Sequence, residues 1–311
     1  MVQNKVYIIG HMPPDLDSVA SAISYAVFKN RIEKTDKYQP ALAGEINKET
    51  EFALKKFVFE KPPVLENAKD QNVILVDHNE FSQSVHGIEQ ANLLEVLDHH
   101  KVDFKYGQPI TFMVEPLGAT CSIIAHMYFA QNIELSENLA GLMLSAILVD
   151  TVIAKLPTCT EKDKKIIEKL AELAGIKDWQ ALGKELFKVR SSVKALKAVE
   201  IIKSDFKNFN FKVGKIGIGQ VETIDLGEFS EREEELLVEL DKLREKDGYH
   251  SVLLLLTDII KEGSLFLTSS EDQAKLEEAL GTKIKRGRVY LDGIISRKKQ
   301  VVPKFAKAFN K

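Results

Sequence analysis

The chain has 311 residues, enough for one large domain or two of ordinary size, and its 44% of hydrophobic residues suffice for a real core. Its formal net charge of −3 argues against wholesale binding to nucleic acid or membranes. No apolar run approaches the roughly 20 residues of a membrane helix, and the N-terminus lacks a signal peptide's apolar stretch. The only cysteines are Cys121 and Cys159, too few for a disulfide framework, so we expect a cytoplasmic protein.

The first half of the chain alternates short β-branched runs with helical patterns, which predicts an α/β domain whose mostly parallel sheet is flanked by helices. Strands are expected at residues 5–10, 73–77 and 94–98. Helices are expected at residues 18–30, 49–57, 118–132, 137–150 and 160–174. Asp17 is in position to cap the first helix, and the segment TEKD from Thr160 predicts a capping box for the last.

The polar segment KVRSSVKAL, which begins at Lys188, predicts a linker at residues 189–195. Residues 1–188 then form one domain, and residues 196–311 form a smaller C-terminal α/β domain. In this second part we expect strands at 206–211, 215–221 and 251–258, a hairpin ending at 264–269, and a last strand before Gly293. Helices are expected at 230–247 and from Glu271. The sequence thus predicts two α/β domains.

Acidic residues and histidines gather where the predicted strands and helices of the first domain end. They are His11, Asp15 and Asp17 in GHMPPDLD, Asp77 in VDHNE, Asp98, His99 and His100 in LDHH, and Asp150 in SAILVD. Each motif alone is an ordinary turn or a solvated helix end. The carboxyl ends of adjacent parallel strands, however, open onto one crevice. So many carboxylates in one crevice would repel each other unless cations neutralise them, which predicts a metal site.

The residue types at these positions indicate which metals the site would take. Carboxylate oxygens favour magnesium or manganese, and a few imidazoles shift the preference toward manganese, cobalt or iron. Zinc could also bind, but the chain has no thiolate cluster of the kind that structural zinc sites use. About six ligands fit two divalent cations that share a carboxylate better than one, and paired ions are typical of phosphoryl transfer.

A basic cluster follows the last predicted strand of the second domain. Arg297, Lys298 and Lys299 stand in a row just after Gly293, and Lys203 and Lys207 precede them in the same domain. Each lysine singly could be a solvated surface residue. Facing a metal-filled crevice, the cluster suits a small, highly charged anion, since Arg and Lys both bind phosphate. The chain has no Walker-type or dinucleotide-binding glycine loop, which argues against an ATP or NAD fold.

Seven motifs together resemble, in order and spacing, the family II inorganic pyrophosphatases of the DHH phosphoesterase superfamily. They are HMPPDLDS, VDHNE, DHH, EPLGAT, AGLMLSAI, LPTCT and SRKKQVVP. The resemblance implies a manganese- or cobalt-dependent cytoplasmic hydrolase that forms a homodimer and needs neither nucleic acid nor a membrane. It also implies an active site between the metal-binding domain and the substrate-binding domain.

The resemblance further implies a role for each candidate residue. One ion would be held by His11, Asp15 and Asp77, and the other by Asp17, Asp77, His99 and Asp150. The pyrophosphate would be bound by His100, Lys207, Arg297 and Lys298. Asp77, Asp98 and His100 would be the catalytic residues, with Asp77 bridging the ions and Asp98 orienting a ligand. A water or hydroxide shared by the ions would hydrolyse pyrophosphate to two phosphates, and a further magnesium would arrive with the substrate.

Two positions depart from the family's usual pattern. Pro13 replaces an asparagine, and Val149 replaces a small polar residue. Neither change removes a charge, so we expect activity to persist. The alternative is an exopolyphosphatase or a phosphodiesterase acting on oligonucleotides or cyclic dinucleotides, but its glycine-rich histidine motif or aromatic platform is missing here. A non-catalytic binding module would have lost a ligand, whereas all six metal ligands are present.

Overall fold

The computed structural model describes residues 5–190 and 196–309, and the chain divides into two compact units, residues 1–190 and 191–311. Helix α6 (Trp179–Arg190) continues two residues into the predicted linker, whose remaining residues, 191–195, lie outside the described ones. Among the described helices, none has the length and apolar character needed to cross a membrane. Each unit is described by itself below.

Unit 1 is an α/β domain, as predicted. Its strands are β1 (Val6–Ile9), β2 (Tyr38–Ala41), β3 (Asn72–Val76), β4 (Asn92–Asp98) and β5 (Thr111–Val114). Its helices are α1 (Leu16–Glu33), α2 (Lys48–Lys56), α3 (Thr120–Ala130), α4 (Glu137–Asp150), α5 (Glu161–Leu173) and α6, with short 3₁₀ turns η1 (Phe81–Gln83) and η2 (Ile88–Gln90).

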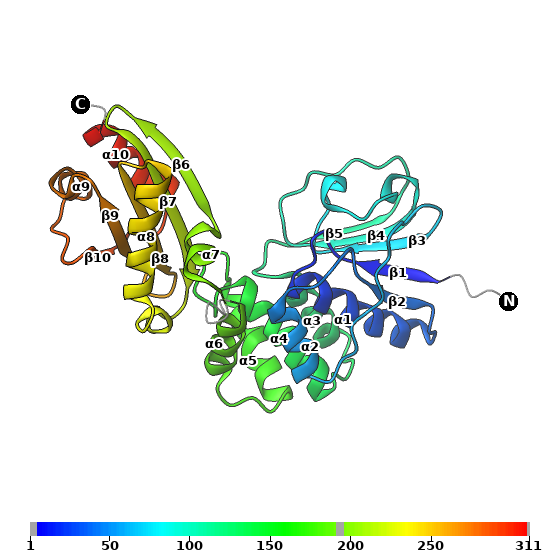
Figure 1. Ribbon diagram of the computed structural model, residues 1–311. Helices are drawn as coiled ribbons and strands as arrows, with labels where there is room; N and C mark the ends of the chain where they lie inside the picture. Colours follow the sequence, from blue (N-terminus) through cyan, green and yellow to red (C-terminus); the bar gives the residue numbers. More distant parts are fainter. Residues whose placement is uncertain (1–4, 191–195, 310–311) are drawn as a thin grey trace. The chain divides into compact units, whose positions relative to one another are not determined.

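The sheet of unit 1 has the strand order β2-β1-β3-β4-β5, and all of its strand pairs are parallel. Helices α1 and α3 pack on one face, and the loops that carry η1 and η2 cover the other (Figure 1). Because both faces are covered, β3 is a continuous apolar run rather than an alternating one. The loops that follow β1, β3 and β4 therefore all lie at the carboxyl ends of these parallel strands.

The predicted cap of the first helix was wrong by two residues. Asp15, not Asp17, is the N-cap of α1, and its Oδ1 accepts a hydrogen bond from Ser18 N at 3.0 Å. Asp17 lies within the first turn and is fully buried. The predicted capping box at α5 is confirmed, with Thr160 and Asp163 bonding each other's backbone. The short strands β2 and β5 and helix α6 were not predicted as elements.

Unit 2 is the smaller α/β domain. Its strands are β6 (Phe206–Phe211), β7 (Gly214–Thr223), β8 (Ser251–Asp258), β9 (Gly263–Ser270) and β10 (Arg288–Asp292). Its helices are α7 (Ala198–Lys203), α8 (Glu233–Asp247), α9 (Gln273–Leu280) and α10 (Val302–Phe309), with a 3₁₀ turn η4 (Leu226–Phe229) and a π-helical turn η5 (Arg297–Val301).

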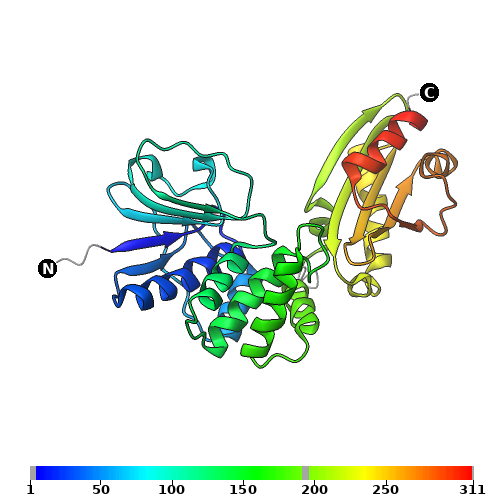
Figure 2. The same ribbon diagram turned by 180° about the vertical axis from the view of Figure 1, so that it is seen from behind.

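The sheet of unit 2 has the order β10-β9-β8-β7-β6, and only β7 and β8 pair in parallel. Helices α7 and α8 form one apolar layer with the sheet, and α9 and α10 form the other. Figure 1 shows α8 in front of the sheet, and the reverse view in Figure 2 shows α10 in front. The central strand β8 is buried along its whole length, as its run of leucines predicts.

Candidate metal centre

The candidate site of unit 1 lies at the carboxyl ends of its strands. β2 lies on one side of β1 and β3 on the other, so the strand order reverses at β1. In open α/β sheets, ligands bind beyond the carboxyl ends of the strands at such a reversal. His11 follows β1, Asp77 follows β3, and His99 follows β4. Asp150, the last residue of α4, joins them from outside the sheet. The tertiary structure thus assembles side chains that are far apart in the sequence.

Asp77 is the centre of the cluster. It has a left-handed backbone conformation, with φ of 64°, which aspartate tolerates better than most residues. Its Oδ2 lies 3.4 Å from His11 Nε2, and its Oδ1 lies 3.4 Å from His99 Nε2. The carboxylate is 1% exposed. Its two oxygens therefore face two different histidines.

Two groups of ligand atoms share this carboxylate. The first group is His11, Asp15 and Asp77, and the second is Asp17, Asp77, His99 and Asp150. Within each group the atoms that could bind a cation lie within 4.8 Å of one another. A third grouping joins Asp77 and His99 to His100. The six predicted metal ligands are thus brought together, and they fall into the two sets that the resemblance implies.

His99 provides a test of whether a cation fits. Its Nδ1 lies 3.0 Å from the carbonyl oxygen of Leu117, so Nδ1 carries the proton whenever the ring is neutral and Nε2 is then the nitrogen free to bind a cation. Its buried Nε2 lies 3.4 Å from Asp77 Oδ1 and 3.6 Å from Asp150 Oδ2, yet it makes no hydrogen bond with any described residue. A buried nitrogen without a hydrogen bond, aimed at two carboxylates, fits a metal ligand.

The N-terminus of α3 holds Asp17. Backbone N–H groups of Thr120 and Cys121 donate to its two carboxylate oxygens, at 2.6 and 3.0 Å. The N-cap residue of α3, Ala119, has no side chain that could accept these bonds. Asp17 therefore caps α3 from a distant helix, and this contact fixes the orientation of its carboxylate.

Asp98 orients His100 and is not itself in any of the three groups. Asp98 Oδ1 lies 2.9 Å from His100 Nδ1 and also accepts hydrogen bonds from the backbone N–H of both His99 and His100. Asn79 donates to the other oxygen at 2.5 Å. Burial opposes ionisation, but the bonds from His100 and Asn79 keep the pKa of Asp98 below its usual value. The bond to Asp98 raises the pKa of His100, whose side chain is 53% exposed.

The charges of the cluster act on each other strongly. Burial by itself would lower the pKa of each histidine, but the carboxylates of Asp15 and Asp77 raise the pKa of His11 to about 10. Asp77 and Asp17 raise the pKa of His99 to about 10. Burial and the neighbouring Asp77 raise the pKa of Asp17 to about 8. Without cations, therefore, protons neutralise this cluster at pH 7.

Burial and the nearby aspartates likewise raise the pKa of Asp150, so its carboxylate also favours a proton in the metal-free protein. The pKa of Asp77 is lowered, since His11 and His99 outweigh its burial. The shared carboxylate is thus the one that stays ionised.

Cation binding should release protons from this site. A cation needs neutral His11 and His99, which hold protons up to a pKa of about 10 in the metal-free protein. The carboxylates of Asp17 and Asp150, whose pKa values are raised, also have to lose a proton before they bind a cation. Manganese binding at pH 7 should therefore release more than two protons, and its affinity should rise from pH 6 to pH 9. Calorimetric titration of metal-stripped protein in buffers of different ionisation enthalpy measures the number released. An affinity that does not change with pH would contradict the assignment of the two histidines.

The predicted substrate-binding residues of unit 2 differ in their exposure and in whether they form an ion pair. Lys207, in β6, and Lys298, in η5, are exposed, and within the described parts of the chain neither makes an ion pair. Arg297 is 9% exposed. Its guanidinium donates to the carbonyl oxygens of Asp205 and Ile218 and pairs with both carboxylate oxygens of Asp205, at 3.0 and 2.9 Å. The charge of Arg297 is thus already neutralised within unit 2.

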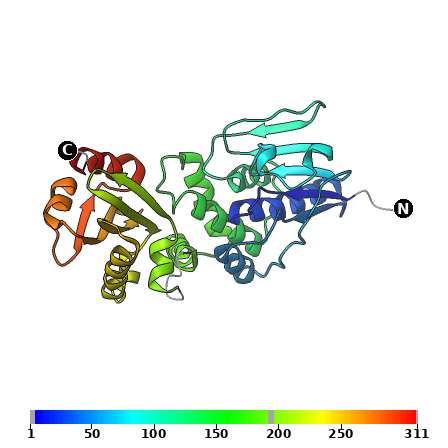
Figure 3. The ribbon, with the colours of Figure 1, turned by 45° about the horizontal axis from the view of Figure 1, so that its top comes forward.

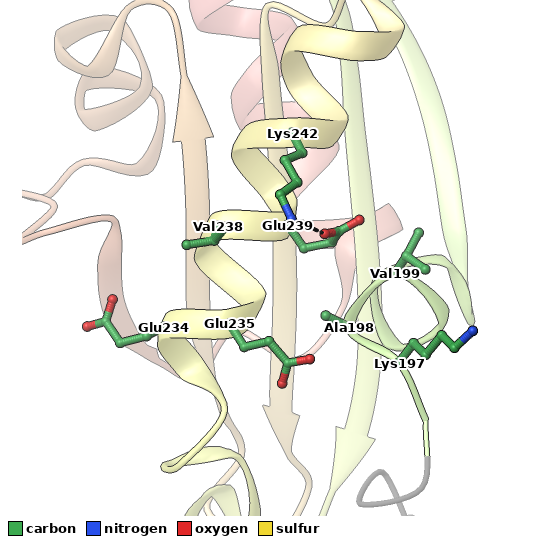
Figure 4. Close-up of a pocket in the computed structure, with 8 residues that line it drawn as sticks. All are labelled: Lys197, Ala198, Val199, Glu234, Glu235, Val238, Glu239 and Lys242. Carbon is green, nitrogen blue, oxygen red and sulfur yellow. Dashed lines mark hydrogen bonds and ion pairs between the residues drawn. The ribbon is translucent and has the colours of Figure 1, made fainter.

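A surface groove of about 510 Å³ lies between α7 and α8 of unit 2, and Lys207, Arg297 and Lys298 are not among the residues that line it (Figure 4). It is lined by Lys197, Ala198, Val199, Glu234, Glu235, Val238, Glu239 and Lys242. Glu239 and Lys242 pair with each other at 3.3 Å. The charged side chains that line the groove are of both signs and lie at the surface, and none of the lining residues is a buried polar residue that points inward. We therefore assign no catalytic or ligand-binding role to this groove.

Sequence reasoning missed the polar side chains that form hydrogen bonds to the candidate metal ligands and to Asp98. Ser18 and Thr120 both donate to Asp77, and Asn79 supports Asp98. Ser18 and Thr120 lie within the motifs HMPPDLDS and EPLGAT, which carried the resemblance, but nothing local in those motifs shows what the hydroxyls touch. The two residues that depart from the family's usual pattern lie outside the ligand groups: Pro13 is exposed and Val149 is buried.

Comparison with known proteins adds independent findings. A family model described as the DHH family, N-terminal domain, matches residues 5–147, and one described as the DHHA2 domain matches residues 184–308. A Methanothrix thermoacetophila protein named manganese-dependent inorganic pyrophosphatase is 45% identical over 311 residues, which cover 99% of each chain. A Bacillus subtilis protein of the same name is 38% identical over 302 residues, covering 96% of this chain and 97% of the relative.

Among solved structures, this chain is similar to a Methanococcus jannaschii protein assigned to the family II inorganic pyrophosphatases. The two are 43% identical, with a TM-score of 0.63, and the match covers 98% of this chain and 100% of that one. The similarity therefore extends through both units.

Proposed function

Because the chain belongs to the family II, manganese-dependent inorganic pyrophosphatases, with their DHH and DHHA2 domains, we propose that it hydrolyses pyrophosphate to two phosphates. The observation that carries the proposal is the position of Asp77, whose two oxygens face two separate groups of cation ligands. A shared carboxylate of this kind suits a pair of divalent cations, which is the arrangement that phosphoryl transfer uses.

We propose manganese or cobalt as the resident cations, with a further magnesium brought by the substrate. The mixture of carboxylate oxygen and imidazole nitrogen supports this choice. Divalent cations, when bound, lower the pKa of coordinated water and stabilise negative charge that develops on phosphate oxygens. The residues of this chain hold the cations in place: Asp77 is shared between them, and the α3 N-terminus fixes Asp17.

We propose that His100 carries a positive charge and binds the pyrophosphate in that form. Asp98 accepts its Nδ1–H and raises its pKa, which favours a protonated ring whose Nε2–H remains for a phosphate oxygen. Lys207 and Lys298 supply further positive charge from exposed positions. Arg297 stays in the proposed set, with the difference that pyrophosphate has to compete with Asp205 for its guanidinium.

The experiment that tests this function measures phosphate release from pyrophosphate, tripolyphosphate and a dinucleotide. The protein is first stripped of metal, and manganese, cobalt or magnesium is then restored singly. We expect manganese-stimulated release from pyrophosphate and little from the other two compounds. A preference for tripolyphosphate would indicate an exopolyphosphatase, and a preference for the dinucleotide a phosphodiesterase. Release from none of them would refute the proposal.

We also propose that the protein acts in the cytoplasm as a homodimer. Both cysteines are free thiols, which suits a reducing compartment. Strand β5 supports the dimer because it is an edge of the unit 1 sheet (Figure 3), with Thr111 and Met113 exposed. The opposite edge, β2, contains Pro40, which has no N–H to donate to a further strand. An edge without proline is the better template for pairing with a second copy.

Light scattering of the purified protein should give twice the 35.0 kDa of one chain. Met113→Cys should then be joined into a covalent dimer by a short bismaleimide, because β5 strands of the two copies would lie side by side. Gln39→Cys, on the β2 edge, is the matched control and should stay unjoined; the unsubstituted protein gives the background from Cys159. A mass of one chain would refute the dimer, and equal joining of both variants would refute the β5 interface.

A further inference from the structure

The shared carboxylate of Asp77 is held by two hydroxyl groups, one on each oxygen. Ser18 Oγ donates to Oδ2 at 3.0 Å, and Thr120 Oγ1 donates to Oδ1 at 3.1 Å. Oδ2 is the oxygen that faces His11, and Oδ1 is the oxygen that faces His99. Each oxygen of Asp77 therefore has one histidine and one hydroxyl as neighbours. Ser18 contacts the oxygen on the side of the first ligand group, and Thr120 contacts the oxygen on the side of the second.

Ser18 comes from the first turn of α1, and its contacts fix where its proton points. Its Oγ accepts a hydrogen bond from the backbone N–H of His11 at 3.2 Å. Its single O–H is then directed at Asp77. The side chain is buried. Ser18 thus connects the backbone of His11 to the carboxylate of Asp77, and both of these residues belong to the first ligand group.

Thr120 is the first residue of α3 and makes the corresponding link in the second group. Its backbone N–H donates to Asp17 Oδ2 at 2.6 Å, while its hydroxyl donates to Asp77 Oδ1. The residue is fully buried. One residue therefore sets the relative position of two of the four ligands in that group.

We propose that Ser18 and Thr120 are positioning residues, each governing the affinity of one cation. Ser18 acts on the cation held by His11, Asp15 and Asp77, and Thr120 on the cation held with Asp17. This inference rests on the proposed function, because it takes the two ligand groups as cation sites. The torsion that turns an aspartate carboxylate is soft. The hydroxyl on each oxygen resists that rotation, and it also fixes the direction in which its own oxygen faces its own ligand group. Hydrogen-bond partners of metal ligands contribute about 10- to 100-fold in affinity.

The test measures manganese binding by calorimetric titration of metal-stripped protein, independently of catalysis. Thr120→Val removes the hydroxyl but keeps the backbone N–H that holds Asp17, and Ser18→Ala removes the other hydroxyl. We expect the unsubstituted protein to bind two cations. Each variant should bind one of them roughly 10- to 100-fold more weakly. Thr120→Ser, which restores the hydroxyl, should recover the lost affinity.

Variants with a single group intact identify which cation is affected. In a His11→Gln background, Thr120→Val should weaken the cation that remains, and Ser18→Ala should change its affinity little. In an Asp150→Asn background the two effects should be exchanged. If both hydroxyl variants weaken both cations equally, the assignment of one hydroxyl to one cation is wrong.

Ser122→Ala is the matched control. Ser122 lies on the same turn of α3 and is fully buried, but within the described part of the chain its hydroxyl has no hydrogen-bond partner. Its removal should leave the affinity for both cations unchanged. Hydroxyl variants that bind both cations as well as the unsubstituted protein does would overturn the inference. If the unsubstituted protein itself binds no manganese or releases no phosphate from pyrophosphate, the proposed function fails instead.

Thermal unfolding of the metal-free variants separates positioning from a purely structural role. A structural hydroxyl would lower the unfolding temperature of the metal-free protein and leave the manganese affinities of the folded protein unchanged; that result would also overturn the inference. We expect the reverse, with the larger effect on affinity.

Discussion

Asp77→Asn should abolish pyrophosphate hydrolysis and weaken the binding of both cations. The substitution keeps the size of the side chain but removes the negative charge that lies between His11 and His99. Phosphate release should fall by roughly a thousandfold or more, which corresponds to a loss of about 4 kcal/mol of transition-state stabilisation. Manganese titration of the same variant should show weaker binding of both cations, because the two groups share this residue.

Asp258→Asn is a matched control for that experiment. Asp258 is also a fully buried aspartate at the end of a strand, β8, but its Oδ1 accepts the backbone N–H groups of Ile260 and Lys261 in unit 2. Its replacement should leave metal binding and the rate unchanged in the folded protein. Circular dichroism of both variants verifies that they fold. Activity retained by Asp77→Asn would show that Asp77 is not the shared ligand.

Lys298→Ala should raise the KM for pyrophosphate while both cations remain bound. Lys298 is exposed and lies in unit 2, whereas all the candidate metal ligands lie in unit 1. A hydrogen bond to a charged group contributes about 1.5–3 kcal/mol. Because 1.4 kcal/mol corresponds to a factor of ten, KM should rise roughly 10- to 100-fold. Steady-state kinetics at several pyrophosphate concentrations, with manganese titrated in parallel, checks both parts.

Lys299→Ala is the control for Lys298, since the two residues are adjacent, exposed and equally charged. We expect Lys299→Ala to change KM little. Equal increases in both variants would indicate a general electrostatic effect of the basic segment rather than a specific contact. Loss of manganese from Lys298→Ala would mean that its role has been misassigned.

Much of the fold follows from local patterns. The predicted bounds of α4, β6 and β8 agree with the structure to the residue. α4 and β8 are strong apolar runs that end at an aspartate, and β6 spaces its three phenylalanines between polar residues. Strands β2 and β5 were not predicted. They are short edge strands, β2 contains Pro40 and β5 is partly exposed, so neither has a clear hydrophobic pattern.

The residue types of the candidate metal centre were also predictable. Carboxylates and histidines that follow strands of a parallel sheet must lie at the same edge, and their mutual repulsion requires cations or protons. The structure brings all six predicted ligands into groups of the expected membership. The sequence therefore determined which residues could bind cations and at which edge of the sheet they lie.

Only the tertiary structure decided how those side chains are oriented and which predicted charges are available. Asp17 reads locally as a helix cap, yet it caps α3, 103 residues away. Arg297 stands in a basic run, yet Asp205, 92 residues away, neutralises it. The physical reason is common to both. A local pattern specifies the residue type and the backbone conformation, whereas the partner of a buried polar side chain depends on which distant element packs beside it.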